Sequence, residues 1–212
     1  MGALDGAPHV QPEDRATWRR WLEANHATAT GVWLVDWRRA SGRQPLGYEA
    51  AIEEALCFGW VDGQAAPLDD QRSKLYFAPR KRRGTWARSN KDRVERLLRA
   101  GRMAPAGMAA VELARSDGTW TILDSVDRLE VPPDLAAALA ARPAARANFD
   151  AFPPSARHGL LGWIALARRD ATRQRRIATT AAAAERNERA NEQGTSAALP
   201  GRGAPGSRRP RR

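Results

Sequence analysis

Two different periods of apolar and polar residues run along the first half of the chain, which predicts a mixture of helices and strands. Pro12 predicts the start of a helix, because a proline in the first turn and the acidic residues after it favour a helix N-terminus. From Gly31 to Arg39, side chains alternate in the manner of a strand. The other elements expected here are a helix over Tyr48–Cys57, strands over Trp60–Gln64 and Lys74–Pro79, and helices that start at Thr85, as an N-cap, and at Pro105.

The helix over Tyr48–Cys57 is expected to pack one face against the core. Its buried stripe is predicted to consist of Ala51, Ile52, Ala55 and Leu56, and its acidic residues Glu49, Glu53 and Glu54 are expected to stay in water. Gly59 favours the end of this helix.

After Pro132–Pro133 the pattern is helical throughout, with helices expected over 134–141, 143–152, 155–168 and from 170, with Asp170 as N-cap, to about 191. Strands and helices do not alternate regularly. The fold class is therefore predicted to be α+β, with a small antiparallel sheet flanked by helices and an all-helical C-terminal module. The expected domains are a disordered N-terminus over 1–11, an α+β domain over 12–130, a helical module over 131–191, and a disordered basic tail over 192–212.

The net charge of +11 is unevenly distributed along the 212 residues. Residues 1–70 hold 6 basic and 11 acidic side chains, whereas residues 71–102 hold 12 basic and 2 acidic ones. Such asymmetry is typical of proteins with an anionic partner. A general bias of the sequence towards alanine and arginine is the competing interpretation.

The absence of certain sequence features argues against several classes of function. Cys57 is the single cysteine, which excludes an intrachain disulfide and favours a reducing compartment. We see no secretory signal, and the longest apolar run, Gly159 to Ala167, is far too short for a membrane span, so a cytoplasmic protein is expected. The three histidines match no metal-ligand spacing, and no nucleotide-binding glycine motif occurs, so neither a metal nor a cofactor is predicted.

The residues most suited to binding lie between positions 60 and 90. Basic residues 80–83 precede a predicted helix N-terminus, where free backbone N–H groups and the helix dipole also attract anions such as phosphate or carboxylate. A solvated loop is the alternative. The predicted ligand-binding residues are Trp60, Asp62, Arg80, Arg82, Trp86 and Asn90.

Four of the conspicuous features have both a structural and a functional interpretation. Asp62 either accepts an arginine fork or acts as a base, and Asn90 either clamps a neighbouring loop or reads a ligand. Cys57 is either a buried structural thiol or a nucleophile, with its position at a helix C-terminus favouring the former. The arginines between 168 and 176 form either a solvated helix face or a weak nucleic-acid patch, which lacks an aromatic stacking platform.

Several segments resemble the YdeI/OmpD-associated family of bacteriocin-protection proteins. They are GVWLVDWRRASG, YEAAIEEALCFGWVDGQ, FAPRKRRGTWARSNKDRVERLLRAGRMAPAG and LLGWIALARRDATRQRRI, within a match from about Thr17 to Asn187. The resemblance implies a soluble bacterial protein with a helical C-terminal domain and a name associated with antimicrobial-peptide resistance. It implies no reaction, cofactor or catalytic residue.

The sequence favours a non-catalytic module that binds an anionic small molecule or partner through residues 60–90. Polyanion or nucleic-acid binding through the arginine-rich segments is a second hypothesis, and an enzyme that uses Asp62 or Cys57 is a third. The oligomeric state is left open.

Overall fold

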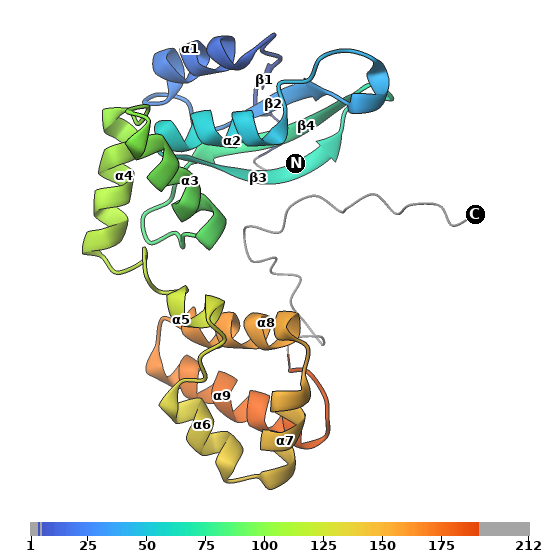
Figure 1. Cartoon of the computed structure of the whole chain (residues 1–212), viewed down its shortest axis with the longest axis vertical. Helices are drawn as coiled ribbons and strands as arrows, with labels where there is room; N and C mark the ends of the chain where they lie inside the picture. Colours follow the sequence, from blue (N-terminus) through green and yellow to red (C-terminus); the bar gives the residue numbers. More distant parts are fainter. Residues whose placement is uncertain (1–3, 5, 191–212) are drawn as a thin grey trace. The chain divides into compact units, whose positions relative to one another are not determined.

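The computed structural model describes residue 4 and residues 6–190, so the tail expected to be disordered over 192–212 lies outside the described residues. The chain divides into unit 1, Met1–Trp120, and unit 2, Thr121–Arg212 (Figure 1). Each unit has its own hydrophobic core. The division falls earlier than the boundary expected at 130–131, because Leu123 and Val126 pack in the second core.

Unit 1 is built on a four-stranded sheet, in the order β1-β2-β4-β3, within the described part of the chain. Strand β2 pairs antiparallel with β4, which pairs antiparallel with β3, and the short edge strand β1 runs parallel to β2. The strands are β1 (His9–Val10), β2 (Val32–Trp37), β3 (Trp60–Pro67) and β4 (Arg72–Pro79). Together with the helices, this sheet confirms the predicted α+β class.

Strand β1 lies inside the segment 1–11 that was expected to be disordered. Its two residues are too few to show a period, so only the pairing with β2 reveals it. The N–H of Trp33 donates to the carbonyl of Pro8 at 2.8 Å, which holds this segment at the sheet edge.

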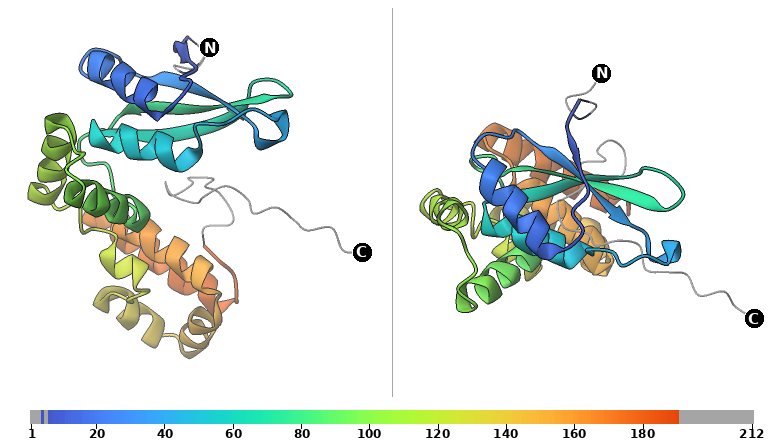
Figure 2. Two further views of the ribbon diagram at one scale, coloured as in Figure 1. Left: turned by 45° about the horizontal axis from the view of Figure 1, so that its top comes forward. Right: turned by 90° about the horizontal axis from the view of Figure 1, so that it is seen from above.

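Helices α1 (Arg15–Asn25) and α2 (Tyr48–Cys57) lie on the same side of the sheet (Figure 2). The bounds of α2 are those predicted from the sequence. Between these helices and the sheet, the indole of Trp18 packs against Phe77 with ring centroids 5.5 Å apart, and its N–H donates to the carbonyl of Ala51 at 3.0 Å. The predicted stripe of α2, namely Ala51, Ile52, Ala55 and Leu56, is buried in this core.

Helix α3 (Arg88–Arg99) begins later than predicted, and its N-cap is Ala87, which makes no side-chain capping bond. The expectation that Thr85 caps this helix is therefore wrong. The chain from Gly84 to Ala87 is irregular, and Trp86 turns into the core beside Trp120, with ring centroids 4.9 Å apart. Burial of this indole outweighs the local capping preference of threonine.

Helix α4 (Pro105–Ser116) passes very close to the end of α2. A Cβ atom on Gly107 would lie 2.2 Å from the carbonyl oxygen of Cys57, and one on Gly59 would lie 3.1 Å from the carbonyl oxygen of Ala106. Gly59 also has φ of +73°. The two glycines therefore permit a backbone approach that no other residue would allow without movement.

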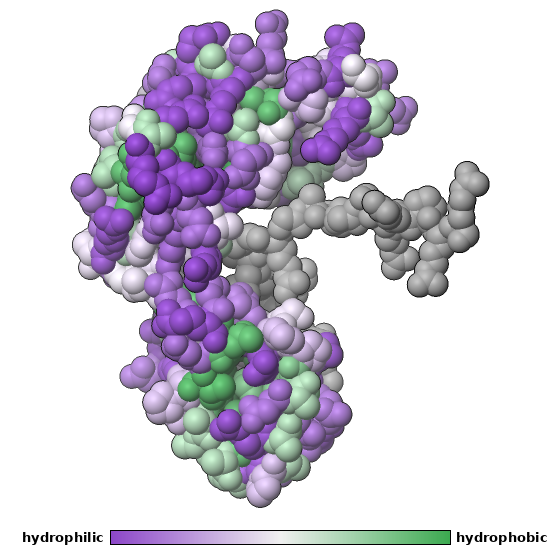
Figure 3. Space-filling view, in the orientation of Figure 1, coloured by the Kyte–Doolittle hydropathy of each residue, from purple (hydrophilic) through white to green (hydrophobic). Residues whose placement is uncertain are grey.

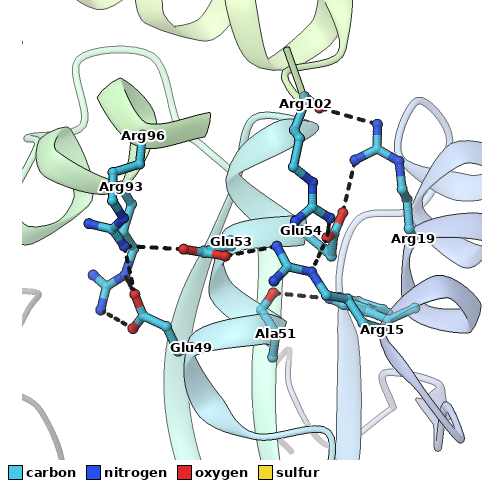
Figure 4. Close-up of polar contacts among 10 residues, drawn as sticks. Arg15, Arg19, Glu49, Ala51, Glu53, Glu54, Arg93, Arg96 and Arg102 are labelled. Carbon is cyan, nitrogen blue, oxygen red and sulfur yellow. Dashed lines mark hydrogen bonds and ion pairs between the residues drawn. The ribbon is translucent and has the colours of Figure 1, made fainter. Parts of the chain in front are cut away.

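A buried carboxylate joins three parts of unit 1 (Figure 4). Glu54 on α2 is 0% exposed, and it pairs with Arg15 at 2.5 Å, with Arg19 at 2.9 Å and with Arg102. The expectation that Glu54 stays in water is therefore wrong. Arginines from α1 and from the segment after α3 cover the carboxylate, so burial and charge pairing occur together.

The other two glutamates of α2 extend this network towards α3. Glu53 lies between Arg15 at 2.7 Å and Arg96 at 3.1 Å, and Glu49 pairs with Arg93 at 2.8 Å and with Arg96 at 3.0 Å. Glu49 is exposed, as expected, whereas Glu53 is half-buried. Much of the visible face of unit 1 in Figure 3 is hydrophilic, which agrees with these paired charges on α2 and α3.

Unit 2 is all-helical within the described residues, as predicted. Arg173 on the last helix forms a two-pronged pair with Asp134, with N–O distances of 2.7 and 2.9 Å. Its helices are α5 (Asp124–Asp127), α6 (Pro133–Ala140), α7 (Pro143–Ala151), α8 (Pro154–Ala165) and α9 (Asp170–Glu185). The N-cap of α9 is Arg169, so the prediction that Asp170 caps it is wrong by one residue.

Replacement of Glu54 by glutamine should destabilise unit 1 by about 3 kcal/mol, because three guanidinium groups lose a buried counter-charge. The matched control is Glu23→Gln, which removes an exposed partner of Arg19 and should cost less than about 0.5 kcal/mol. Urea unfolding followed by tryptophan fluorescence measures both. Equal losses in the two variants would contradict a structural role for the Glu54 cluster.

Replacement of Gly107 by alanine should destabilise unit 1 by about 1–3 kcal/mol, because the new methyl group meets the Cys57 carbonyl. In an open helix the same change would stabilise by up to about 1 kcal/mol. The sign of the change in unfolding free energy, measured in urea, therefore tests the close approach of α4 and α2.

Candidate functional site

The basic loop, residues 80–84, connects β4 to the segment before α3. Its start is fixed by the N–H of Arg80, which donates to the carbonyl of Gly59 at 2.9 Å. Its end is a turn in which the N–H of Gly84 donates to the carbonyl of Lys81 at 3.0 Å. Between them Arg83 has a φ of +61°, a left-handed conformation that is uncommon for arginine and is often retained at binding sites.

The guanidinium of Arg80 lies over the ring of Trp86, with its carbon 3.7 Å from the ring centroid. One terminal nitrogen donates to the carbonyl of Thr85 at 3.2 Å. The Nε atom is shielded from solvent and has no hydrogen-bond partner among the described residues. Burial lowers the pKa of Arg80 to about 10, and the attraction of Asp62 only partly opposes this.

The loop borders a small hollow of about 30 Å³. That volume holds a few water molecules or one small polyatomic group, and it is well below the size of a metabolite pocket. The wall combines cationic, apolar and acidic groups from the loop and from the C-terminal half of α4. The lining residues are Arg80, Lys81, Arg82, Arg83, Gly84, Trp86, Ala110, Leu113, Ala114, Asp117 and Thr119.

Asp117 brings one carboxylate to this otherwise cationic wall. Hydrogen bonds from the hydroxyl and the N–H of Thr119, at 2.6 and 3.0 Å, lower the pKa of Asp117, and the charge of Arg83 lowers it further. The hollow therefore already contains an anionic group, which also interacts with the backbone N–H of Arg83 at the left-handed turn.

Asp62 on β3 lies next to this region without lining the hollow. Its carboxylate accepts a hydrogen bond from the hydroxyl of Tyr48 at 3.2 Å. Burial and the negative charge of Asp62 together raise the pKa of Tyr48 to about 12. Asp62 also attracts Arg80 and Arg93 electrostatically, so it balances cations from two sides.

Of the six residues expected to bind a ligand, three line the hollow, and the other three, Trp60, Asp62 and Asn90, do not. Arg80, Arg82 and Trp86 line the hollow together. Trp60 is 1% exposed and its indole N–H donates to the carbonyl of His26 at 3.3 Å, because the strand register turns it towards α1. Asn90 is buried and its side-chain oxygen accepts from Arg93 at 3.0 Å, so it positions an arginine of the glutamate network.

Cys57 is fully buried at the C-terminal end of α2. Burial raises the pKa of its thiol, and the nearby Glu54 carboxylate raises it further. A nucleophilic cysteine needs the opposite shift, so the geometry favours a structural thiol.

Asp117 and Thr119 are the polar lining residues that the sequence did not reveal. They lie more than thirty positions after the basic loop, and the Asp117–Gly118 pair predicts only a helix end. Only the packing of α4 brings them to the loop.

Two classes of site were searched for across the described part of the chain. No group of three or more histidine, cysteine, aspartate or glutamate side chains lies together there as metal ligands would. None of the helices described is both long and apolar enough to cross a membrane.

Two family models match separate parts of the sequence. Residues 10–110 match a domain of unknown function (DUF8412), and this region contains the FGWVDG block, the basic loop and the GRMAPAG block. Residues 128–187 match the family described as "Bacteriocin-protection, YdeI or OmpD-Associated". Comparison with curated proteins gave no significant match, and neither did comparison with solved structures. The predicted family resemblance is therefore confirmed over residues 128–187, where the sequence matches the model of this family.

Proposed function

We propose that unit 1 is a non-catalytic module that binds an anionic group of a small molecule or partner at the hollow beside the basic loop. The observation that carries this proposal is the shielded Nε atom of Arg80, which has no partner among the described residues. A buried donor without an acceptor costs about 1–3 kcal/mol, and more when it belongs to a charged group. An oxyanion at this position would remove that cost.

The charges around the hollow support the same ligand chemistry. Four consecutive basic residues, 80–83, face one lining carboxylate, that of Asp117. The guanidinium of Arg80 is held by the ring of Trp86 and by the carbonyl of Thr85, so its position is fixed before the oxygens of a phosphate or carboxylate bind.

The size of the hollow limits how much of the ligand enters it. About 30 Å³ admits the anionic group alone, so the rest of the ligand would extend outside. The side chain of Leu113, which is exposed, borders the hollow and offers an apolar contact there. The proposed ligand thus carries a carboxylate or phosphate next to an apolar part.

The observation that links this chain to bacteriocin protection is the family match over residues 128–187. The net charge of +11 disfavours direct capture of cationic peptides, because like charges repel. We therefore propose that any protective effect depends on an anionic ligand or partner of the protein rather than on the peptide itself.

Phosphate and acetate should each raise the melting temperature of the wild-type protein in a saturable way, because a ligand that binds only the folded state stabilises it. Arg80→Gln should abolish this increase, since it removes a guanidinium of the residues that line the hollow. The matched control is Arg99→Gln, an exposed charge on α3, which should leave the increase unchanged. A thermal-shift titration at constant ionic strength measures all three proteins.

Two outcomes would contradict the proposal. One is an absence of saturable stabilisation in the wild type up to high anion concentration. The other is equal stabilisation of the wild type and Arg80→Gln, which would indicate a general salt effect.

Deletion of the gene should increase the sensitivity of the host cells to bacteriocins. Wild-type protein and Arg99→Gln should restore resistance, whereas Arg80→Gln should not. Growth inhibition assays with the complemented strains measure this. Full restoration by Arg80→Gln would separate the hollow from protection, and unchanged sensitivity of the deletion strain would remove the physiological link.

A further inference from the structure

The sheet of unit 1 has a second face, which points away from α1 and α2 (Figure 2). Side chains alternate along a strand, so Val32, Leu34 and Phe77 face the helix-covered core, and their neighbours face the other way. The second face is therefore formed by Trp33, Val35 and Trp37 on β2, which pair in register with Tyr76, Lys74 and Arg72 on β4. None of these six residues belongs to the core cluster of unit 1.

Aromatic rings and cations alternate on this face. Lys74 places its ammonium nitrogen 4.4 Å from the ring centroid of Trp33, whose ring also meets Tyr76 edge-on at 5.3 Å. Four residues further along β2, the ring of Trp37 carries the guanidinium of Arg43 at 4.6 Å and that of Arg72 at 5.8 Å. Trp33 and Val35 are each only 4% exposed, whereas Trp37 and Tyr76 are half-buried. The accessible part of this face is therefore a strip that consists of Trp37, Tyr76 and the cations Arg43, Arg72 and Lys74.

The charge of the strip is not balanced. Arg72 pairs with Asp69 at 2.7 Å. Lys74 and Arg43 have no carboxylate partner among the residues that the structure describes, and Arg43 is exposed. A sheet face that only needed protection from water would be covered by apolar side chains. A strip of uncompensated cations on aromatic rings instead matches a partner that is both anionic and able to stack.

We propose that this strip, defined by Trp37, Arg43, Arg72, Lys74 and Tyr76, binds single-stranded nucleic acid. Unpaired bases stack on aromatic rings and on arginine guanidinium planes, and the phosphates pair with the cations. The outward guanidinium of Arg43, which lies on Trp37, provides one such plane. A duplex keeps its bases stacked internally and gains only the phosphate contacts.

This surface is separate from the hollow beside the basic loop, since the two share no residue. It also differs from the arginine-rich segments to which a weak nucleic-acid affinity was assigned from the sequence. Those segments lack aromatic rings on which bases could stack, whereas the sheet face has them.

The test uses the full-length protein and a fluorescein-labelled 12-nucleotide oligothymidylate, with anisotropy measured over a range of salt concentrations. The wild type should bind the single strand more tightly than a duplex of the same length. Trp37→Ala should weaken single-strand binding by roughly 5- to 150-fold through the loss of stacking. Arg43→Gln should reduce the slope of log K against log salt by about 0.7, because one phosphate contact is lost.

Arg99→Gln is the control, since it removes an equal charge from a helix surface and should leave the salt slope unchanged. Circular dichroism and thermal melting check that Trp37→Ala folds, and Arg43→Gln changes only an exposed side chain. Equal affinity for single strand and duplex would overturn the proposal. The proposal would also be overturned if both Trp37→Ala and Arg43→Gln bound the single strand with the affinity of the wild type. The same holds if Arg43→Gln and Arg99→Gln changed the salt slope equally.

Discussion

The buried carboxylate of Glu54 determines how charge is distributed over unit 1. A carboxylate with 0% exposure is stable only when cations and hydrogen-bond donors surround it, and Arg15, Arg19 and Arg102 provide both. Burial alone would lower the pKa of Arg15, but its pairs with Glu54 and Glu53 raise it overall. The cluster thereby ties α1, α2 and the segment after α3 into one body.

The same network leaves other cations without an equivalent partner. The three glutamates of α2 pair with five arginines from α1, α3 and the segment after it. No ion pair joins the basic loop to a glutamate among the described residues, whereas Asp62 attracts Arg80, and Asp117 and Arg83 attract each other. The arginines around α2 are neutralised by its glutamates, whereas the cations of the basic loop have no such partners in the part of the chain that the structure describes. The high net charge of the chain therefore points to the loop as a candidate site for anions.

The sequence predicted what depends on local periodicity. The bounds of α2, the three longer strands and the helical C-terminal module follow from the spacing of apolar residues. It failed where packing overrides local preference: Thr85 has a good capping side chain, yet burial of Trp86 keeps that segment irregular. Glu54 is charged, so its pattern indicates solvent, and its burial depends on arginines more than thirty residues away.

The candidate site was predictable to a similar extent. Adjacent residues such as Arg80, Arg82 and Trp86 were identified from the basic run before a helix, whereas Asp117 and Thr119 join the hollow only through the crossing of α4 over α2. Trp60 and Asn90 show the limit of residue type as a guide. The register of β3 directs Trp60 into the core, and Asn90 is bonded to the neighbouring Arg93. Neither arrangement can be read from residue types alone.

The binding of an anion at Arg80 can be observed at the atom concerned, by recording the Nε–Hε resonances of the arginines while phosphate is added. The resonance of Arg80 should shift in a saturable way and exchange more slowly with water, because its Nε–H gains an acceptor. An Arg80 resonance that stays unchanged while those of exposed arginines drift with salt would contradict anion binding at the hollow.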